Sequence, residues 1–100
     1  MVRSLPKDTV GRHFAGQLLR SATSIGANLC EADMSDTARD FCNKVNIAQK
    51  EAAETVYWIS LLREPNLSAP EGLSAIEAEA LALQKICRQI VHSSRRNART

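Results

Sequence analysis

Hydrophobic residues recur along most of this 100-residue chain with the period of an α-helix. In the first such segment the apolar positions are separated by steps of three and four residues: Phe14, Leu18, Ala22, Ile25, Leu29 and Ala32. A half-buried strand would repeat every second residue instead. The spacing therefore predicts a helix over about residues 10–33, with Asp8 or Thr9 as its N-cap.

Two later segments show the same pattern. The stripe of the second is Phe41, Val45, Ala48, Ala52, Thr55, Ile59 and Leu62, and that of the third is Leu73, Ile76, Ala80, Leu83, Cys87 and Ile90. Ser35 and Asp36 are capping residues and Pro65 is a helix breaker, which predicts a helix over about 36–63. Ser68 and Glu71 stand in capping-box register before a third helix over about 69–94.

The links between these segments are short, so consecutive helices should pack antiparallel. A chain of this length forms one domain at most. We therefore expect a single all-α domain over residues 1–100, an antiparallel up-and-down bundle with three long helices.

The centre of the first segment, "SATSIGAN" (residues 21–28), contradicts its helical period, because Ser, Thr, Gly and Asn are poor helix formers. A polar stripe at heptad spacing runs beside the apolar one: Gln17, Ser21, Ser24, Asn28 and Glu31. Ala15, Ala22 and Gly26 add a face with almost no side chain. Either this is a solvated face, or it is a close helix–helix or subunit contact. The second interpretation explains better why a helix interior tolerates Gly26, at a cost of ~1 kcal/mol.

Tyr57 and Trp58 are adjacent and so point about 100° apart on a helix. One ring can enter the bundle while the other faces a neighbour. The candidates for helix packing or subunit contact are Gln17, Ser21, Ser24, Gly26, Asn28, Tyr57 and Trp58.

Composition excludes several classes of protein. Hydrophobic residues make up 44% of the chain but aromatic residues only 4%, which suits an aliphatic helical core. Cys30, Cys42 and Cys87 are odd in number and lack metal-ligand spacing, as in a cytoplasmic protein with reduced thiols. No apolar run is long enough to span a membrane. We expect a cytoplasmic protein with no membrane partner.

The sequence predicts no catalytic residues, no cofactor and no metal. The two histidines, His13 and His92, neighbour no nucleophile elbow, and no Gly-rich phosphate loop is present. Glu51 and Glu54 are one Glu-x-x-Glu step without the Glu-x-x-His motif of di-metal bundles. We expect them to form a charge pair with Lys50 or Arg39 instead.

One charge pattern stands out near the C-terminus. Cationic side chains recur there at steps of three and four, with one more alongside: Lys85, Arg88, His92, Arg95, Arg96 and Arg99. We call this set the basic ridge and expect it along the outer side of the third helix. It complements the helix dipole, as Glu71, Glu77 and Glu79 do at the other end, or it binds a polyanion, or it contacts another protein.

Two long motifs carry a family resemblance. "LLRSATSIGANLCEA" (18–32) and "KVNIAQKEAAETVYWISLLRE" (44–64) resemble the four-helix bundle protein family, encoded by intervening sequences in bacterial large-subunit ribosomal RNA genes and by free-standing genes. The resemblance implies an up-and-down four-helix bundle, a ring-shaped homopentamer and no catalytic residues. A related member, the accessory variability protein of diversity-generating retroelements, binds nucleic acid and works with a reverse transcriptase.

Family members usually carry a further amphipathic helix before the region matching "SLPKDTVGRHF". We expect that this helix is either absent here or lost to a start codon placed too late. Three helices leave an apolar groove where the fourth would lie, and we expect Ile25, Ile47, Val56 and Ile86 to wall it.

We therefore expect a non-enzymatic homo-oligomeric scaffold, with a pentamer favoured, that binds RNA or DNA without base specificity through repeated basic ridges. The alternative is an interaction module that docks a partner protein and has no role with nucleic acid.

Overall fold

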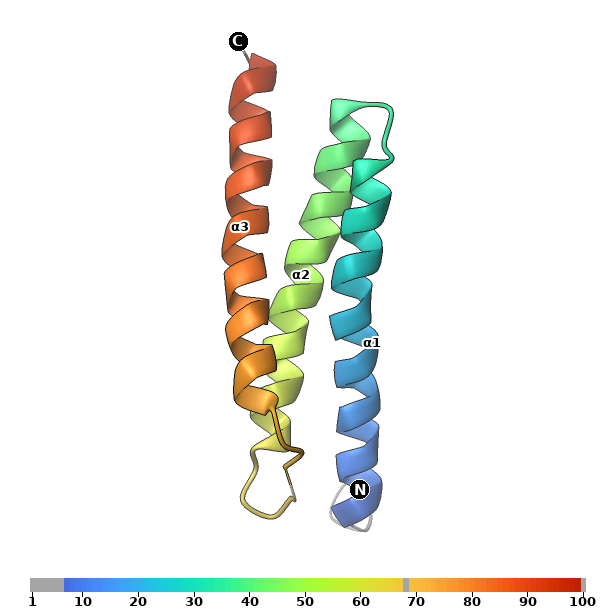
Figure 1. Ribbon diagram of the computed structural model, residues 1–100, viewed down its shortest axis with the longest axis vertical. Helices are drawn as coiled ribbons and strands as arrows, with labels where there is room; N and C mark the ends of the chain where they lie inside the picture. The colour runs from blue at the N-terminus through green and yellow to red at the C-terminus, as the bar shows by residue number, and fades with distance from the viewer. Residues whose placement is uncertain (1–6, 68, 100) are drawn as a thin grey trace.

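The computed structural model describes residues 7–67 and 69–99, with side chains described from residue 8 to residue 95 of those ranges. Within them the chain forms three helices and no strand: α1 (Lys7–Asp33), α2 (Ala38–Leu62) and α3 (Leu73–Arg99). Figure 1 shows an up-and-down arrangement in which α2 lies between the other two helices. Both α1 and α3 pack along α2 and barely meet each other in the described residues. The expected all-α antiparallel bundle is confirmed.

The helix ends differ from the sequence prediction by a few residues. The N-cap of α2 is Thr37, whose hydroxyl accepts a hydrogen bond from the Asp40 amide at 3.0 Å. Ser35 instead donates to the carbonyl of Glu31 at the end of α1. The third helix begins only at Leu73, after Gly72 adopts a positive φ of 84° that other residues avoid. Ser68, the expected cap, lies outside the described residues.

The core consists of two apolar clusters along the bundle. The larger contains Ile25, Ala32, Val45, Ala48, Ala52, Cys87 and Val91, and the smaller contains Leu18, Ile59, Leu62 and Leu73. The stripes of α1 and α2 therefore face the core as their spacing predicted. The buried face of α3 is slightly rotated from the predicted stripe. Val91, which was not in that stripe, is buried, whereas Ile76, which was, is 37% exposed.

A buried pair of hydroxyl groups separates the two clusters. Ser21 of α1 and Thr55 of α2 are both fully buried, and their hydroxyl oxygens lie 3.0 Å apart. Each hydroxyl also donates a hydrogen bond to a carbonyl of its own helix. Ser21 donates to the carbonyl of Leu18, and Thr55 donates to that of Glu51. Small side chains are needed where α1 and α2 meet this closely. This contact explains why polar residues interrupt the apolar period of α1, and it fixes the register of the two helices.

Candidate nucleic-acid interface

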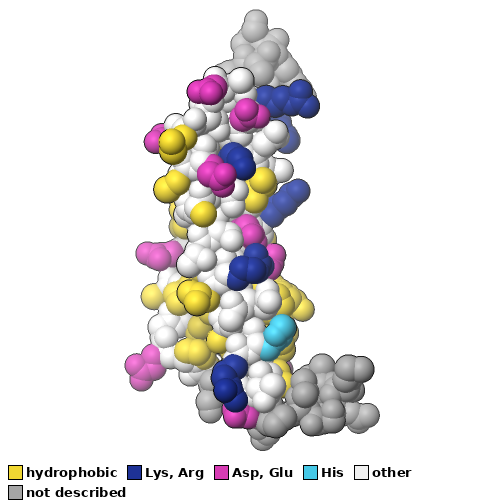
Figure 2. All heavy atoms as spheres, turned by 90° about the vertical axis from the view of Figure 1, so that its right-hand side faces the viewer, with side chains coloured by type: hydrophobic (Ala, Val, Ile, Leu, Met, Phe, Trp, Pro, Cys, Tyr) yellow, Lys and Arg dark blue, Asp and Glu magenta, His cyan; other side chains and the backbone are white. Residues whose placement is uncertain are grey.

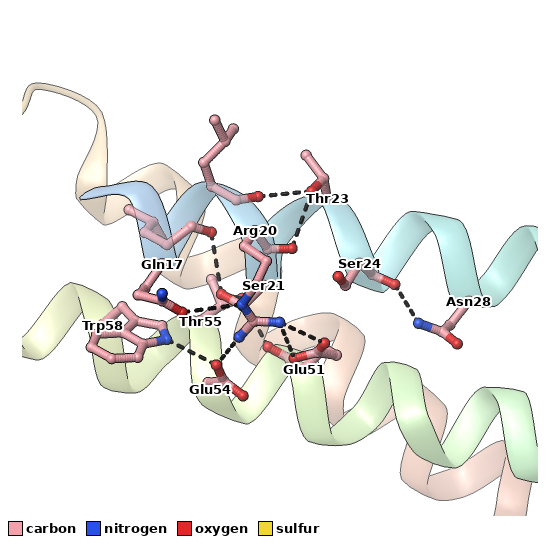
Figure 3. A network of polar contacts seen from close by, with 12 residues as sticks. Gln17, Arg20, Ser21, Thr23, Ser24, Asn28, Glu51, Glu54, Thr55 and Trp58 are labelled. Atoms are coloured by element: carbon pink, nitrogen blue, oxygen red, sulfur yellow. Dashed lines mark hydrogen bonds and ion pairs between the residues drawn. The ribbon is translucent and has the colours of Figure 1, made fainter. Parts of the chain in front are cut away.

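The polar stripe of α1 forms a network with α2 (Figure 3). Arg20 forms ion pairs with Glu51, at 3.1 Å, and with Glu54, and its Nε donates to Gln17 at 3.1 Å. Trp58 Nε1 donates to the same Glu54 carboxylate at 3.0 Å. The expectation that Lys50 or Arg39 would pair with these glutamates is wrong, because α1 brings its own arginine to them. This network and the buried hydroxyl pair make the stripe an α1–α2 packing surface.

The other predicted contact residues lie at the edge of this surface. Ser24 and Asn28 are half-buried, and the Asn28 amide donates to the Ser24 carbonyl. Gly26 is exposed, and a Cβ built on it would meet nothing within 4 Å. Trp58 packs on Phe14, with ring centroids 5.9 Å apart, whereas Tyr57 is 54% exposed. A subunit contact through Gly26 and Tyr57 stays a prediction.

Most cations outside α3 whose side chains are described form an ion pair with a carboxylate. Arg12 pairs with Asp8 within α1, and Lys44 of α2 pairs with Glu31 of α1. Arg63, at the end of α2, bonds to Glu77 of α3. On the face shown in Figure 2, basic and acidic side chains accordingly lie next to one another along the molecule. Positive and negative side chains are therefore mixed on that face, which does not favour binding of a polyanion.

The basic ridge differs from that face. Lys85, Arg88, His92 and Arg95 are all exposed on α3, and among the described side chains none of them forms an ion pair. The side chains of Arg96 and Arg99 lie outside the described set. From Lys85 to Arg95 the ridge extends over ten residues, or ~15 Å along the helix axis.

Contacts at both ends place the ridge next to α2 rather than on the far side of α3. At one end Arg63 of α2 reaches Ser74 and Glu77, which precede the ridge on the same flank of α3 at helical spacing. At the other end Arg95 lines a hollow together with Arg39 of α2. The ridge therefore borders a second exposed surface, which belongs to α2.

That α2 surface escaped the sequence analysis. It is a stripe at steps of three and four whose members are Arg39, Asn43, Asn46, Lys50, Ala53 and Tyr57. Arg39, Lys50 and Tyr57 are exposed, and neither cation pairs with a described carboxylate. The regular spacing could have revealed the stripe, but only the tertiary packing places Arg39 and Asn43 at one hollow with Arg95 of α3. At this hollow the cations of α2 and α3 meet, and Lys50 and the exposed ring of Tyr57 lie farther along the α2 stripe.

Among the described residues no group of three or more His, Cys, Asp or Glu side chains could hold a metal ion. Burial raises the pKa of the Cys87 thiol above its ordinary 9.0, which keeps that core thiol neutral and unreactive. Of the helices in the described part of the chain, none has an apolar stretch sufficient to cross a membrane.

Comparisons with known proteins agree with this architecture. A family model described as 23S rRNA-intervening sequence protein matches residues 1–89. Among solved structures, a protein with unknown function from the S23 ribosomal protein family of Bacteroides thetaiotaomicron VPI-5482 is 41% identical, with a TM-score of 0.69. The match covers 79% of this chain and 70% of that chain. A search of curated proteins found no match.

Proposed function

The chain belongs to the 23S rRNA-intervening sequence protein family, and we propose that it is a non-enzymatic, homo-oligomeric helical scaffold that binds RNA or DNA without base specificity. The observation that carries this proposal is the unequal neutralisation of its cations. Arg12, Arg20, Lys44 and Arg63 each have a carboxylate partner, whereas the described side chains of the basic ridge have none.

Unpaired cations on one surface favour a polyanion because their mutual repulsion is relieved when phosphates approach. The helix-dipole interpretation accounts for cations in the last turn of α3, since the dipole effect fades beyond one turn. It does not account for Lys85 and Arg88, which lie more than two turns before Arg99. Nor does it account for Arg39 and Lys50 on the neighbouring helix.

Self-association is supported by apolar side chains left in solvent. Leu19 on α1 is 66% exposed, and Ile86 on α3 is 49% exposed. The expected groove residue Ile25 is buried in the core at 4% exposure, so that expectation is wrong for this side chain. Ile76 of α3, at 37%, is a further exposed apolar side chain. Assembly would repeat the basic surface around the oligomer and multiply a weak affinity for a long polyanion.

Nucleic-acid binding is tested by fluorescence anisotropy with labelled single-stranded RNA and duplex DNA of unrelated sequences. We expect similar affinities for different sequences and a steep loss of affinity as salt is raised, since bound cations release counterions. The double variant Lys85→Ala/Arg88→Ala should lower the slope of log K against log salt by about 1.5, at roughly 0.7–0.9 per lost phosphate contact. Light scattering on the same samples measures the oligomeric state.

The matched control is Arg12→Ala/Lys44→Ala, which removes the same net charge from side chains that already have carboxylate partners. We expect this control to keep the wild-type salt slope. Equal slopes for the two double variants, or no binding at low salt, would refute nucleic-acid binding through the ridge. That result would favour the alternative function, docking of a partner protein on the exposed apolar residues.

A further inference from the structure

A hollow of about 430 Å³ opens between the beginning of α2 and the C-terminal part of α3. These two segments lie at the same end of the bundle, where α3 extends past the start of α2 (Figure 1). Arg39 and Asn43 line the hollow from α2, and Ser94 and Arg95 line it from α3. The hollow is large enough for a phosphate group and its attached sugar, since one water occupies about 30 Å³.

The charged residues described in the lining of this hollow are all basic. Two arginines from different helices line it, and none of its described lining residues is acidic. Asp36 and Asp40 are close to Arg39 in sequence, yet no ion pair joins them to it in the described structure. Two like charges at one hollow repel each other unless an anion lies between them. The arrangement therefore favours occupation by an anion.

The donors suit a tetrahedral oxyanion in particular. A guanidinium presents a planar fork of N–H groups that matches two phosphate oxygens, and two such forks can hold one phosphate from two sides. The Ser94 hydroxyl and the Asn43 amide are neutral donors at the same hollow. The amides of Asp40 and Phe41 bond to Thr37, which leaves those of Ala38 and Arg39 as free donors of the first turn of α2.

We propose that this hollow, the Arg39–Arg95 pocket, binds one phosphate group of a polynucleotide backbone between the two arginines. The proposal rests on the proposed function and adds a specific anchoring point to it. A strand held there can continue along the basic ridge past His92 and Arg88 of α3, which are both exposed. Arg39 is then a phosphate-binding residue that lies on α2, whereas the basic ridge lies on α3.

Coupling between the two arginines tests the pocket. The probe is a short single-stranded RNA, measured against Arg39→Ala, Arg95→Ala and the double variant. We expect each single variant to weaken binding roughly tenfold, the effect of one lost charge-assisted hydrogen bond. Because both arginines hold the same phosphate, the double variant should lose much less than the product of the two effects. Circular dichroism confirms that these exposed substitutions leave the helices intact.

The matched control pairs Arg39→Ala with Lys85→Ala, which lies on α3 outside the pocket. These two losses should multiply, since the side chains contact different phosphates. The pocket is refuted if the affinity losses of Arg39→Ala and Arg95→Ala multiply in the same way. It is also refuted if Arg39→Ala leaves the affinity unchanged while Lys85→Ala/Arg88→Ala lowers it. In both cases the proposed function stands. If the wild-type chain binds neither RNA nor DNA, the proposed function fails first.

A titration with inorganic phosphate, followed by NMR, distinguishes two possible ligands of the pocket: a phosphate group of a polynucleotide backbone and a free phosphate ion. Weak phosphate binding that disappears in Arg39→Ala and in Arg95→Ala, together with coupled RNA binding, supports the pocket as a backbone anchor. Phosphate binding with the same dependence in a chain that binds no RNA would overturn the assignment, because the ligand would then be a free phosphate.

Discussion

Gly26 is a position where the fold of one chain and the proposed assembly would favour different residues. It lies in the interior of α1, exposed, and an added Cβ would meet nothing within 4 Å in the chain itself. Glycine in a helix interior costs about 0.8–1.0 kcal/mol relative to alanine. Gly26→Ala should therefore stabilise the isolated fold by that amount. If the small-residue face is a subunit contact, the same methyl group stands in the way of a partner helix.

The magnitude can be converted into an observable. For a domain of 60–100 residues, 1 kcal/mol corresponds to a shift in Tm of about 4–8 °C. Gly16 is a matched control, because it too is exposed in the interior of α1 with nothing within 4 Å of an added Cβ. Gly16→Ala should raise the Tm by the full amount at every protein concentration. It lies away from the face shared by Ala15, Ala22 and Gly26.

The assay is thermal unfolding followed by circular dichroism over a wide range of protein concentration, with sedimentation equilibrium on the same samples. We expect Gly26→Ala to match Gly16→Ala at high dilution and to gain less than it where the wild type is assembled. The bulkier Gly26→Leu should split the assembly. Identical behaviour of both alanine variants at all concentrations would refute the subunit contact at Gly26. A lowered Tm for Gly16→Ala would refute the helix-propensity argument itself.

Two further predictions concern the core. Ile25→Asp places an unpaired charge in the larger apolar cluster and should abolish cooperative unfolding in urea. Ala27→Asp, on the exposed side of α1, should change the free energy of unfolding by less than about 0.5 kcal/mol. Equal losses of stability in the two variants would contradict the assignment of the core. Cys30 is exposed and should react rapidly with a thiol reagent, while Cys87 reacts only on unfolding. The folded-state pKa of Cys87 lies above its ordinary 9.0, so its contribution to stability is complete below that pH and falls as pH rises through it. In Cys87→Ala that alkaline loss should shrink, and an undiminished loss would exclude Cys87 as its source.

The helical architecture was predictable because apolar spacing reports directly on which face of a helix is buried. The stripes of α1 and α2 were read correctly, including the buried Thr55, whose place in the period outweighed its polarity. The helix ends were less predictable. Ser35, Asp36 and Thr37 are all capping residues, and only the path of the chain between α1 and α2 selects Thr37.

The candidate interface could be predicted only in part. Lys85, Arg88, His92 and Arg95 share a flank of one helix, so the sequence was enough to group them. Spacing along a helix says nothing about which neighbouring helix a flank borders, so the approach of Arg39 to Arg95 could not be predicted. The same limit led to the wrong partner for Glu51 and Glu54.

The sequence by itself thus determined three amphipathic helices, their order and the basic ridge, because these depend on residues close together along the chain. The tertiary structure alone decided three things: the pairing of Arg20 with Glu51 and Glu54, the buried hydroxyl pair of Ser21 and Thr55, and the meeting of Arg39 with Arg95 at one hollow. Each joins residues that are more than thirty positions apart. Their proximity is set by the rotation and register at which whole helices pack, which depend on all the core side chains together and not on any local pattern.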